Sequence, residues 1–222
     1  MTINEKFTKD MVNQNNSKKK THHSKKNTVS VRIENVVASI DLGRKINLDM
    51  LLGKYSDMVK KKNFPGIIVK IKYPKSTILI FKSGKLVLTG LKMAKYVPII
   101  VEKIINKLEN AKIKLKQKPV VKVENIVSRG DFHQRINLDI ASLILNRAIY
   151  EPEVFPGLIY KRTDPKVCFL IFSSGKIICT GASSEDVIKK SIKNLAIKLK
   201  KNDVLGRKKK DFESINLDDL LN

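Results

Sequence analysis

The chain contains the same sequence pattern twice, about 90 residues apart. The first copy reads VRIENVVASIDL, INLD, NFPGIIVKIKYP and ILIFKSGKLVLTG, and the second reads VKVENIVSRGDF, INLD, VFPGLIYKRTDP and FLIFSSGKIICTG. Asn35 and Asn125 are 90 positions apart, whereas Phe64 and Phe155 are 91 apart, so the second copy has gained one residue before its FPG turn. A tandem duplication predicts a pseudo-twofold molecule, which suits a pseudo-symmetric target such as duplex DNA.

The duplication divides the 222 residues into two repeats and two tails. We expect a first repeat at 31–118, a second at 119–205, and tails at 1–30 and 206–222. The N-terminal tail centres on SKKKTHHSKK and has too little apolar surface to offset the entropy of ordering it, so we expect it to be disordered. The C-terminal tail leaves the repeat pattern. A frayed tail and a short acidic helix around LDDLL are both open interpretations of it.

Each repeat predicts a strand, a helix, further strands and a closing helix. The first strands are expected at Val31–Ile40 and Val121–Ser128. Asn47 and Asn137 precede helical spacing and are typical helix-start residues. The closing helices have apolar residues on one side and lysines on the other, which indicates helices lying on a sheet. Pro98 fits the first closing helix only within its first turn.

The overall charge points to a polyanionic partner. The formal net charge is +24 and the isoelectric point is about 10.0. A lysine-rich proteome would also raise the lysine content, so the charge supports this interpretation without deciding it. Cys168 and Cys179 are predicted to be small buried residues in a reducing compartment. No apolar run approaches about 18 residues and no signal segment is present, so we expect a soluble intracellular protein.

The sequence contains no pattern typical of an enzyme. It lacks a set of His and Cys residues at metal-ligand spacing, a phosphate-binding loop and a Ser/His/Asp arrangement. His133 stands alone after Phe132, and His22 and His23 lie in the N-terminal tail. We therefore expect no catalytic residue, metal, cofactor or small-molecule substrate. A DNA-processing enzyme with a related domain would need an added catalytic module, and the two repeats occupy nearly the whole chain.

The strands are apolar on both sides, which is the main indication of function. In Lys85–Thr89, Leu86 and Leu88 point to one side and Val87 to the other, and Ile78–Phe81 alternates in the same way. The four predicted helices can cover only one face of such a sheet, and the other face should then be polar. An apolar second face with a basic rim predicts an interaction surface. Burial of this face in a dimer is the alternative.

Paired Asn and Thr residues on this second face point to the DNA minor groove. An A·T pair presents only acceptors there, adenine N3 and thymine O2. The amides of Asn35 and Asn125 and the hydroxyls of Thr89 and Thr180 can donate to these acceptors. Flat Val and Leu side chains can pack against a groove floor that lacks the guanine amino group.

The motifs ENVVAS and ENIVS, YEPEVFPGLIY, LIFSSGK and CTGA occur in order, and the strand and FPG motifs occur in duplicate. In these motifs the sequence resembles the TATA-box-binding protein family over residues 31–201. The FPG turn in both repeats and the VASIDL motif favour the archaeal branch of the family. The resemblance implies an α+β fold: two tandem pseudo-symmetric repeats form a saddle, with a curved ten-stranded antiparallel sheet and helices on its convex face.

The resemblance also implies a role for each site residue. Groove-floor residues would be Asn35, Val37, Leu79, Val87, Thr89, Asn125, Val127, Leu170, Ile178 and Thr180. The wedges inserted between base pairs would be Phe64, Phe81, Phe155 and Phe172. Residues facing phosphates would be Lys70, Ser83, Lys85, Lys161, Ser174 and Lys176. Family members often have Arg at the positions of Lys70 and Lys161, so the bidentate contact of Arg is lost there.

By this resemblance the chain is a general transcription initiation factor that binds TATA-box promoter DNA in the minor groove. Phe intercalation bends the duplex, by about 80° in the family. Glu151, Glu153 and Val154 would form a stirrup loop that recruits transcription factor B and, with it, RNA polymerase. Because the second repeat has YEPEVF where the first has KKKNF, this surface could set the direction of assembly.

Two other functions stay open at the level of sequence. One is a paralogue of the family without TATA specificity, and the other is a basic protein that binds RNA or chromatin. The protein is expected with the chromosome, in the cytoplasm of an archaeon or in the nucleus of a eukaryote.

Overall fold

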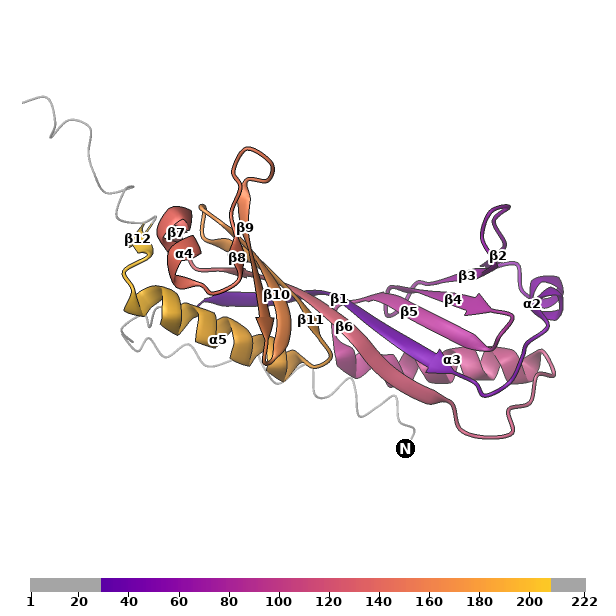
Figure 1. Cartoon of the computed structure of the whole chain (residues 1–222). Coiled ribbons are helices and arrows are strands. Elements are labelled where there is room, and N and C mark those ends of the chain that lie inside the picture. Colours follow the sequence, from indigo (N-terminus) through magenta and orange to yellow (C-terminus); the bar gives the residue numbers. More distant parts are fainter. Residues whose placement is uncertain (1–28, 209–222) are drawn as a thin grey trace, which may run out of the picture.

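The computed structural model describes residues 29–208, and in it both repeats contribute to one long, twisted sheet (Figure 1). The strands of the first repeat are β1 (Ser30–Asp41), β2 (Met58–Val59), β3 (Gly66–Ile71), β4 (Ser76–Phe81) and β5 (Lys85–Leu91). The second repeat adds β6 (Val120–Asp131), β7 (Gln134–Ile136), β8 (Ala148–Ile149), β9 (Gly157–Thr163), β10 (Lys166–Phe172), β11 (Lys176–Ala182) and β12 (Leu205–Lys208). The helices are α2 (Leu48–Lys54), α3 (Val97–Asn110), α4 (Leu138–Ile144) and α5 (Glu185–Lys201), with a 3₁₀ turn at Ala94–Tyr96.

The main sheet is symmetric about its centre. Its ten strands follow the order β2-β3-β4-β5-β1-β6-β11-β10-β9-β8, and the paired neighbours run antiparallel. Each repeat supplies five adjacent strands, so the order in one half mirrors the order in the other. This arrangement confirms the predicted fold class, the ten-stranded saddle.

The pseudo-twofold axis passes between the two longest strands. Strands β1 and β6 pair along their full length, with Val36 opposite Ile126. On either side of this pair, Asn35 lies opposite Val127 and Val37 lies opposite Asn125. The duplicated Asn residues are therefore related across the centre of the sheet.

The short helices begin at the predicted residues because an Asn side chain caps each of them. Asn47 accepts a hydrogen bond from the backbone N–H of Asp49 (3.0 Å), and Asn137 accepts one from Ile140 (3.1 Å). Such caps satisfy donors that the first helical turn leaves free. Pro98 lies in the first turn of α3, as predicted.

The core lies between one face of the sheet and the long helices α3 and α5, which run along the same side of the sheet in Figure 1. Leu86 and Leu88 in β5 are fully buried there, as are Ile78 and Ile80 in β4. Val87 lies between the two leucines in sequence and is only half-buried. This alternation agrees with α3 and α5 covering one face, and within residues 29–208 no helix covers the other, which we call the open face.

A second, two-stranded sheet was not predicted. Strand β12 pairs with β7, placing Leu205 opposite Ile136, and the N–H of Asn137 donates to the carbonyl of Val204 (3.0 Å). Residues 206–208, which we expected in a C-terminal tail, therefore lie in this strand. These residues have no apolar alternation, so their pairing depends on the position of β7 and not on a local pattern.

The two cysteines lie on opposite faces of the sheet. Cys179 is buried, and burial raises the pKa of its thiol to about 12. Cys168 is half-buried on the open face, so the expectation that both would be buried was wrong for Cys168. The features expected in residues 1–28 and 209–222 lie outside the described residues. Between residues 29 and 208, none of the helices has the length and apolar character needed to cross a membrane.

Candidate nucleic-acid interface

The open face carries the apolar floor that the sequence predicts. Leu79 lies opposite Val87 in one half, and Leu170 lies opposite Ile178 in the other. These four side chains are half-buried, unlike the fully buried neighbours that point toward the helices. The predicted apolar residues brought together on this face are Val37, Leu79, Phe81, Val87, Val127, Leu170, Phe172 and Ile178. They form a continuous floor, since neighbouring strands contribute them in register.

In the first half, Asn35 is bonded to Thr89 and Gly90. Its Oδ1 accepts from the N–H of Gly90 (2.7 Å), and its Nδ2 lies 3.2 Å from the Thr89 hydroxyl. Gly90 has φ +94°, a left-handed conformation that favours glycine. The glycine N–H fixes which end of the amide is the oxygen, so the Nδ2 group remains a donor.

The second half repeats this arrangement. Asn125 Oδ1 accepts from the N–H of Gly181 (2.8 Å) and from the Thr180 hydroxyl (3.1 Å). Gly181 has φ +99°, matching its counterpart in the first half. Two fixed amide donors therefore lie on either side of the central axis.

Phenylalanine pairs lie toward both ends of the apolar floor. The ring centroids of Phe64 and Phe81 are 5.6 Å apart, and those of Phe155 and Phe172 are 6.0 Å apart. All four rings are only half-buried. In each pair, one ring comes from the last residue of β4 or β10 and the other from the Phe of an FPG turn, and two tilted rings present a rigid apolar edge.

The glycine of each FPG turn makes room for these rings. A Cβ atom at Gly157 would lie 2.8 Å from the ring of Phe155 and 3.0 Å from the ring of Phe172. At Gly66 it would lie 2.5 Å from the carbonyl oxygen of Ile80. The duplicated glycine therefore allows each ring pair to pack against the start of the following strand.

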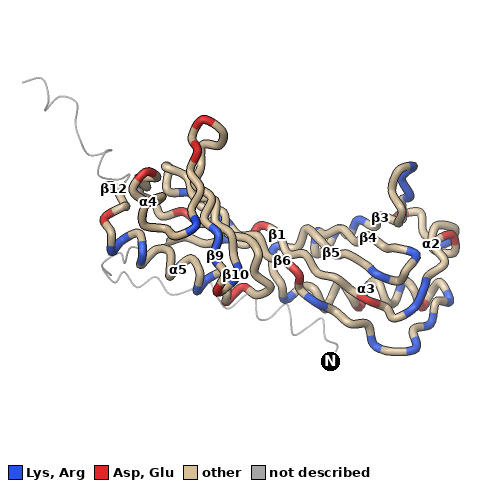
Figure 2. Tube along the Cα trace, viewed as in Figure 1, with Lys and Arg blue, Asp and Glu red and all other residues tan. Residues whose placement is uncertain are grey.

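Basic residues lie on the strands and turns that carry the floor, and Figure 2 marks the Lys and Arg positions along the trace of the described residues. The predicted phosphate-facing lysines, all exposed, are Lys70, Lys85, Lys161 and Lys176. Ser83 is exposed and Ser174 half-buried, each in the turn before one of these lysines. This placement leaves the ammonium groups accessible to phosphate.

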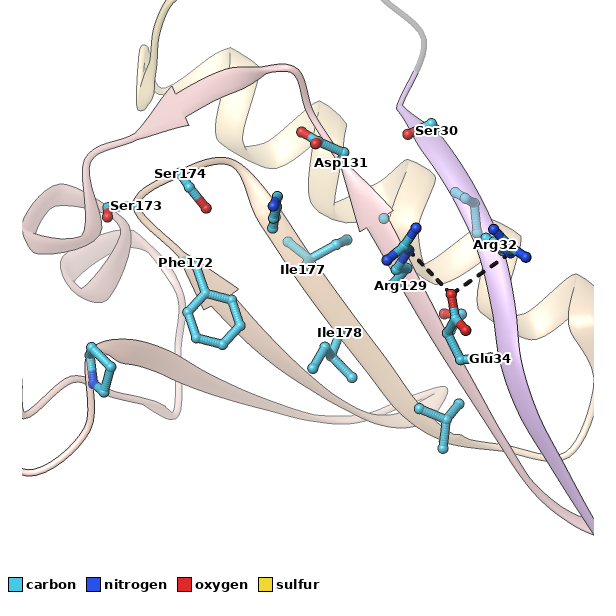
Figure 3. Close-up of a pocket in the computed structure, with 16 residues that line it drawn as sticks. Ser30, Arg32, Glu34, Arg129, Asp131, Phe172, Ser173, Ser174, Ile177 and Ile178 are labelled. Atoms are coloured by element: carbon cyan, nitrogen blue, oxygen red, sulfur yellow. Dashed lines mark ion pairs between the residues drawn. The ribbon is translucent and has the colours of Figure 1, made fainter. Parts of the chain in front are cut away.

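An ion cluster on the floor was missed at the level of sequence. The Glu34 carboxylate lies 3.2 Å from Arg129, 3.9 Å from Arg32 and 3.6 Å from Lys92. Figure 3 shows Glu34 between the two arginines, in a groove of about 1130 Å³ that also contains Phe172 and Ile178. Arg129 follows Val127 by two residues in β6, so strand alternation could have placed it on the open face.

The corresponding acid in the second repeat has different partners. Glu124 accepts hydrogen bonds from the Ser39 hydroxyl (2.7 Å) and the Lys122 ammonium (2.9 Å). The bond from Ser39 and then that from Lys122 lower the pKa of the Glu124 carboxyl. Glu34 and its counterpart Glu124 therefore each have a basic neighbour on the open face.

The three predicted partner-binding residues lie in one loop, away from the floor. This second stirrup loop (residues 150–156) joins β8 to β9 and rises from the sheet in Figure 1. The carbonyl of Glu151 accepts from the N–H groups of Val154 (3.0 Å) and Phe155 (2.9 Å), which folds the loop back on itself. Glu151 and Glu153 are exposed, and Val154 is 80% exposed. The loop therefore presents two acids and one apolar side chain to a partner.

Within residues 29–208 there is no group of three His, Cys, Asp or Glu residues that could hold a metal ion. The open face offers amide and hydroxyl donors, an apolar floor, rigid aromatic edges and a basic rim.

Comparisons with known proteins show which family contains this duplicated sequence. The family model described as "Transcription factor TFIID (or TATA-binding protein, TBP)" matches residues 30–111 and 120–202. The TATA-box-binding protein of Pyrococcus abyssi is 42% identical over 180 residues, covering 79% of this chain and 92% of that protein. The chain belongs to the TATA-binding protein family.

Further relatives in the TATA-binding protein family agree in sequence and structure. The TATA-box-binding protein of Aeropyrum pernix is 38% identical over 176 residues, covering 79% of this chain and 87% of the relative. The solved structure of Methanococcus jannaschii TBP superposes with a TM-score of 0.69 at 37% identity, covering 77% of this chain and 98% of that one. These relatives are archaeal, as the FPG turns of both repeats predict. The two segments matched by the family model correspond to the two halves of the sheet.

Proposed function

We propose that this chain is a transcription initiation factor without catalytic activity, which binds the minor groove of AT-rich promoter DNA through its open face. The relatives are named for binding the TATA box. The observation that carries the proposal is the duplicated Asn–Thr–Gly arrangement on an apolar floor, in two symmetric copies. A duplex presents matching acceptors on either side of its own local twofold axis, so both copies find equivalent partners.

Recognition of A·T pairs follows from the fixed amides. Because glycine N–H groups occupy the Oδ1 atoms of Asn35 and Asn125, the Nδ2 groups donate to adenine N3 and thymine O2. Val37 and Val127 flank these amides and pack against the floor of the groove. A guanine amino group would project into this apolar contact.

Bending follows from the aromatic pairs. An apolar wedge enters the minor groove by separating two base pairs, which costs a few kcal/mol per step. Phe81 with Phe64 and Phe172 with Phe155 would each open one step, so the duplex kinks at both ends of the contact. Pyrimidine–purine steps unstack most easily, and this adds sequence preference without a hydrogen bond.

Charged residues complete the interface. The exposed lysines around the floor neutralise phosphates and release counterions. Arg32 and Arg129 add two guanidinium groups from the floor itself, held in place by Glu34. At the second stirrup loop, Glu151, Glu153 and Val154 provide the contact for transcription factor B, which brings RNA polymerase to the bound promoter.

A competition experiment tests the binding function. Affinities for a TATA duplex, a GC-rich duplex of equal length and an RNA hairpin are compared at one fixed salt concentration, because the basic rim binds any polyanion at low salt. We expect the TATA duplex to bind roughly a thousandfold more tightly than the GC-rich duplex. Equal affinity for the two duplexes would favour a paralogue without TATA specificity, and tighter binding of the hairpin would favour an RNA-binding protein.

A further inference from the structure

The two stirrup loops have the same position in the fold and opposite charge. The first stirrup loop (residues 60–65) joins β2 to β3 and is the counterpart of the second, and both rise from the sheet in Figure 1. The first carries Lys60, Lys61 and Lys62, whereas the second carries Glu151 and Glu153. Figure 2 shows one loop blue and the other red. The two halves of the floor are nearly equivalent, so the opposite charge of the stirrup loops is a large difference between the two repeats.

The three lysines of the first stirrup loop are free to meet a ligand. All three are exposed, and among the residues that the structure describes none of them forms an ion pair. Lys107 and Lys122, by comparison, are paired with Asp57 and Glu124. The ammonium groups of three consecutive unpaired lysines repel one another, so an anionic partner lowers their electrostatic energy.

The loop holds these lysines beside the aromatic pair of the first half. The N–H of Phe64 donates to the carbonyl of Lys61 (3.2 Å), which closes a tight turn between them. In such a turn the two Cα atoms lie within about 7 Å of each other. The Phe64 ring contacts Phe81 at the end of the floor, so the three lysines belong to the loop next to this end.

We propose that Lys60, Lys61 and Lys62 bind phosphates of the duplex flanking one end of the site, making the first stirrup loop a one-sided clamp for flanking DNA. The inference rests on the proposed function, since it places DNA on the open face. The second stirrup loop cannot act in this way, because Glu151 and Glu153 repel phosphate. The protein therefore holds flanking duplex at its first half and leaves the other flank open.

The clamp has a measurable signature in flank length and salt. Each phosphate neutralised adds about 0.9 to the slope of log affinity against log salt, so three lysines add at most about 2.7. Exposed charge contacts are individually weak, and three together should strengthen binding of flanked DNA roughly tenfold at low salt. One flank is enough for this contact, because the protein can bind the element in either orientation and so place its first half next to that flank.

The test compares three duplexes that carry one AT-rich element with flanking sequence on both sides, on one side or on neither. For the unmodified chain, removing one flank should weaken binding about twofold, because only one of the two binding orientations then allows the contact. Removing both flanks should weaken binding roughly tenfold. The variant Lys60→Gln, Lys61→Gln, Lys62→Gln should bind all three duplexes alike. As a matched control, Gln at Lys189, Lys190 and Lys193, exposed on the back of α5, should keep the flank dependence.

A gain-of-contact variant provides the second arm. Glu151→Lys with Glu153→Lys gives both halves a basic loop, so two flanks should then bind roughly fivefold more tightly than one. The inference is overturned if the triple Gln variant keeps the flank dependence of the unmodified chain, or if the Glu→Lys variant does not distinguish one flank from two. Failure of the proposed function looks different, since a GC-rich element between the same flanks would then bind the protein as tightly as the AT-rich element.

Discussion

At the scale of single residues, the open face depends on polar side chains whose direction is fixed by the backbone. Asn35 and Asn125 would be free to rotate if their oxygens had no partner. The N–H groups of Gly90 and Gly181 hold them, and these glycines adopt a left-handed conformation that other residues enter at a cost of about 1 kcal/mol. The glycine after each Thr is therefore part of the proposed recognition site, although it need not touch DNA.

This arrangement leads to a test by near-isosteric substitution. In Asn35→Asp with Asn125→Asp, the remaining oxygens still accept from the glycines, so the free energy of unfolding should change little. The variant can no longer donate to adenine N3 or thymine O2 and sets two charges against acceptors. We expect affinity for an AT-rich duplex, measured by anisotropy, to fall roughly a hundredfold.

The control for this test is Asn146→Asp, an exposed turn residue in the second repeat. It adds one such charge outside the floor, where the double variant adds two on it, and should change affinity less than about threefold. An Asn35, Asn125 double variant that binds as tightly as the control would show that the amides do not read the bases.

At the scale of elements, the two stirrup loops show how duplicated loops can diverge while the strands around them do not. Strands β3 and β9 begin with corresponding glycines, Gly66 and Gly157, and both strands pair with the following strand in register. The loops before them bear no such constraint, because their side chains are exposed. Charge on these loops therefore gives each half of a symmetric sheet a chemically different loop.

The acidic loop predicts a separation of two binding steps. Glu151→Arg with Glu153→Arg should leave binding to a TATA duplex alone intact, because neither residue lies on the floor. Formation of the complex with transcription factor B should fall at least tenfold, since two attractive charges become repulsive. Gel shifts with and without factor B measure both steps, and Val154→Ala tests the apolar part of the contact.

An unimpaired complex of the Arg variant with factor B would exclude the second stirrup loop as the docking surface. A loss of binding to DNA alone, by contrast, would place this loop within the DNA interface.

At the scale of the whole molecule, the duplication explains which parts could be predicted from the sequence. Strand alternation and the repeat together placed Phe81 and Phe172 on the open face, because the same pattern occurred twice. The contact between Glu34 and Arg129 could not be predicted in this way. It joins the two repeats across the central pair of strands, at an irregularity in register between Ile33 and Asn35 that no local pattern encodes.

The pairing of β12 with β7 was missed for a related reason. Leu205 meets Ile136 only after the second repeat has folded and brought these segments together. Local periodicity in the sequence describes a strand and its faces, whereas the partner of a short strand depends on the complete fold.

The central claim is that the duplicated wedges bend DNA on the open face. Energy transfer between dyes at the ends of a short TATA duplex measures this directly, since bending brings the ends together. The unmodified chain should bend the duplex strongly, and Phe81→Ala with Phe172→Ala should reduce the bend and weaken binding. Tyr73→Ala, which removes an exposed aromatic ring from a turn, should change neither. A duplex that stays straight while bound with full affinity would contradict the account.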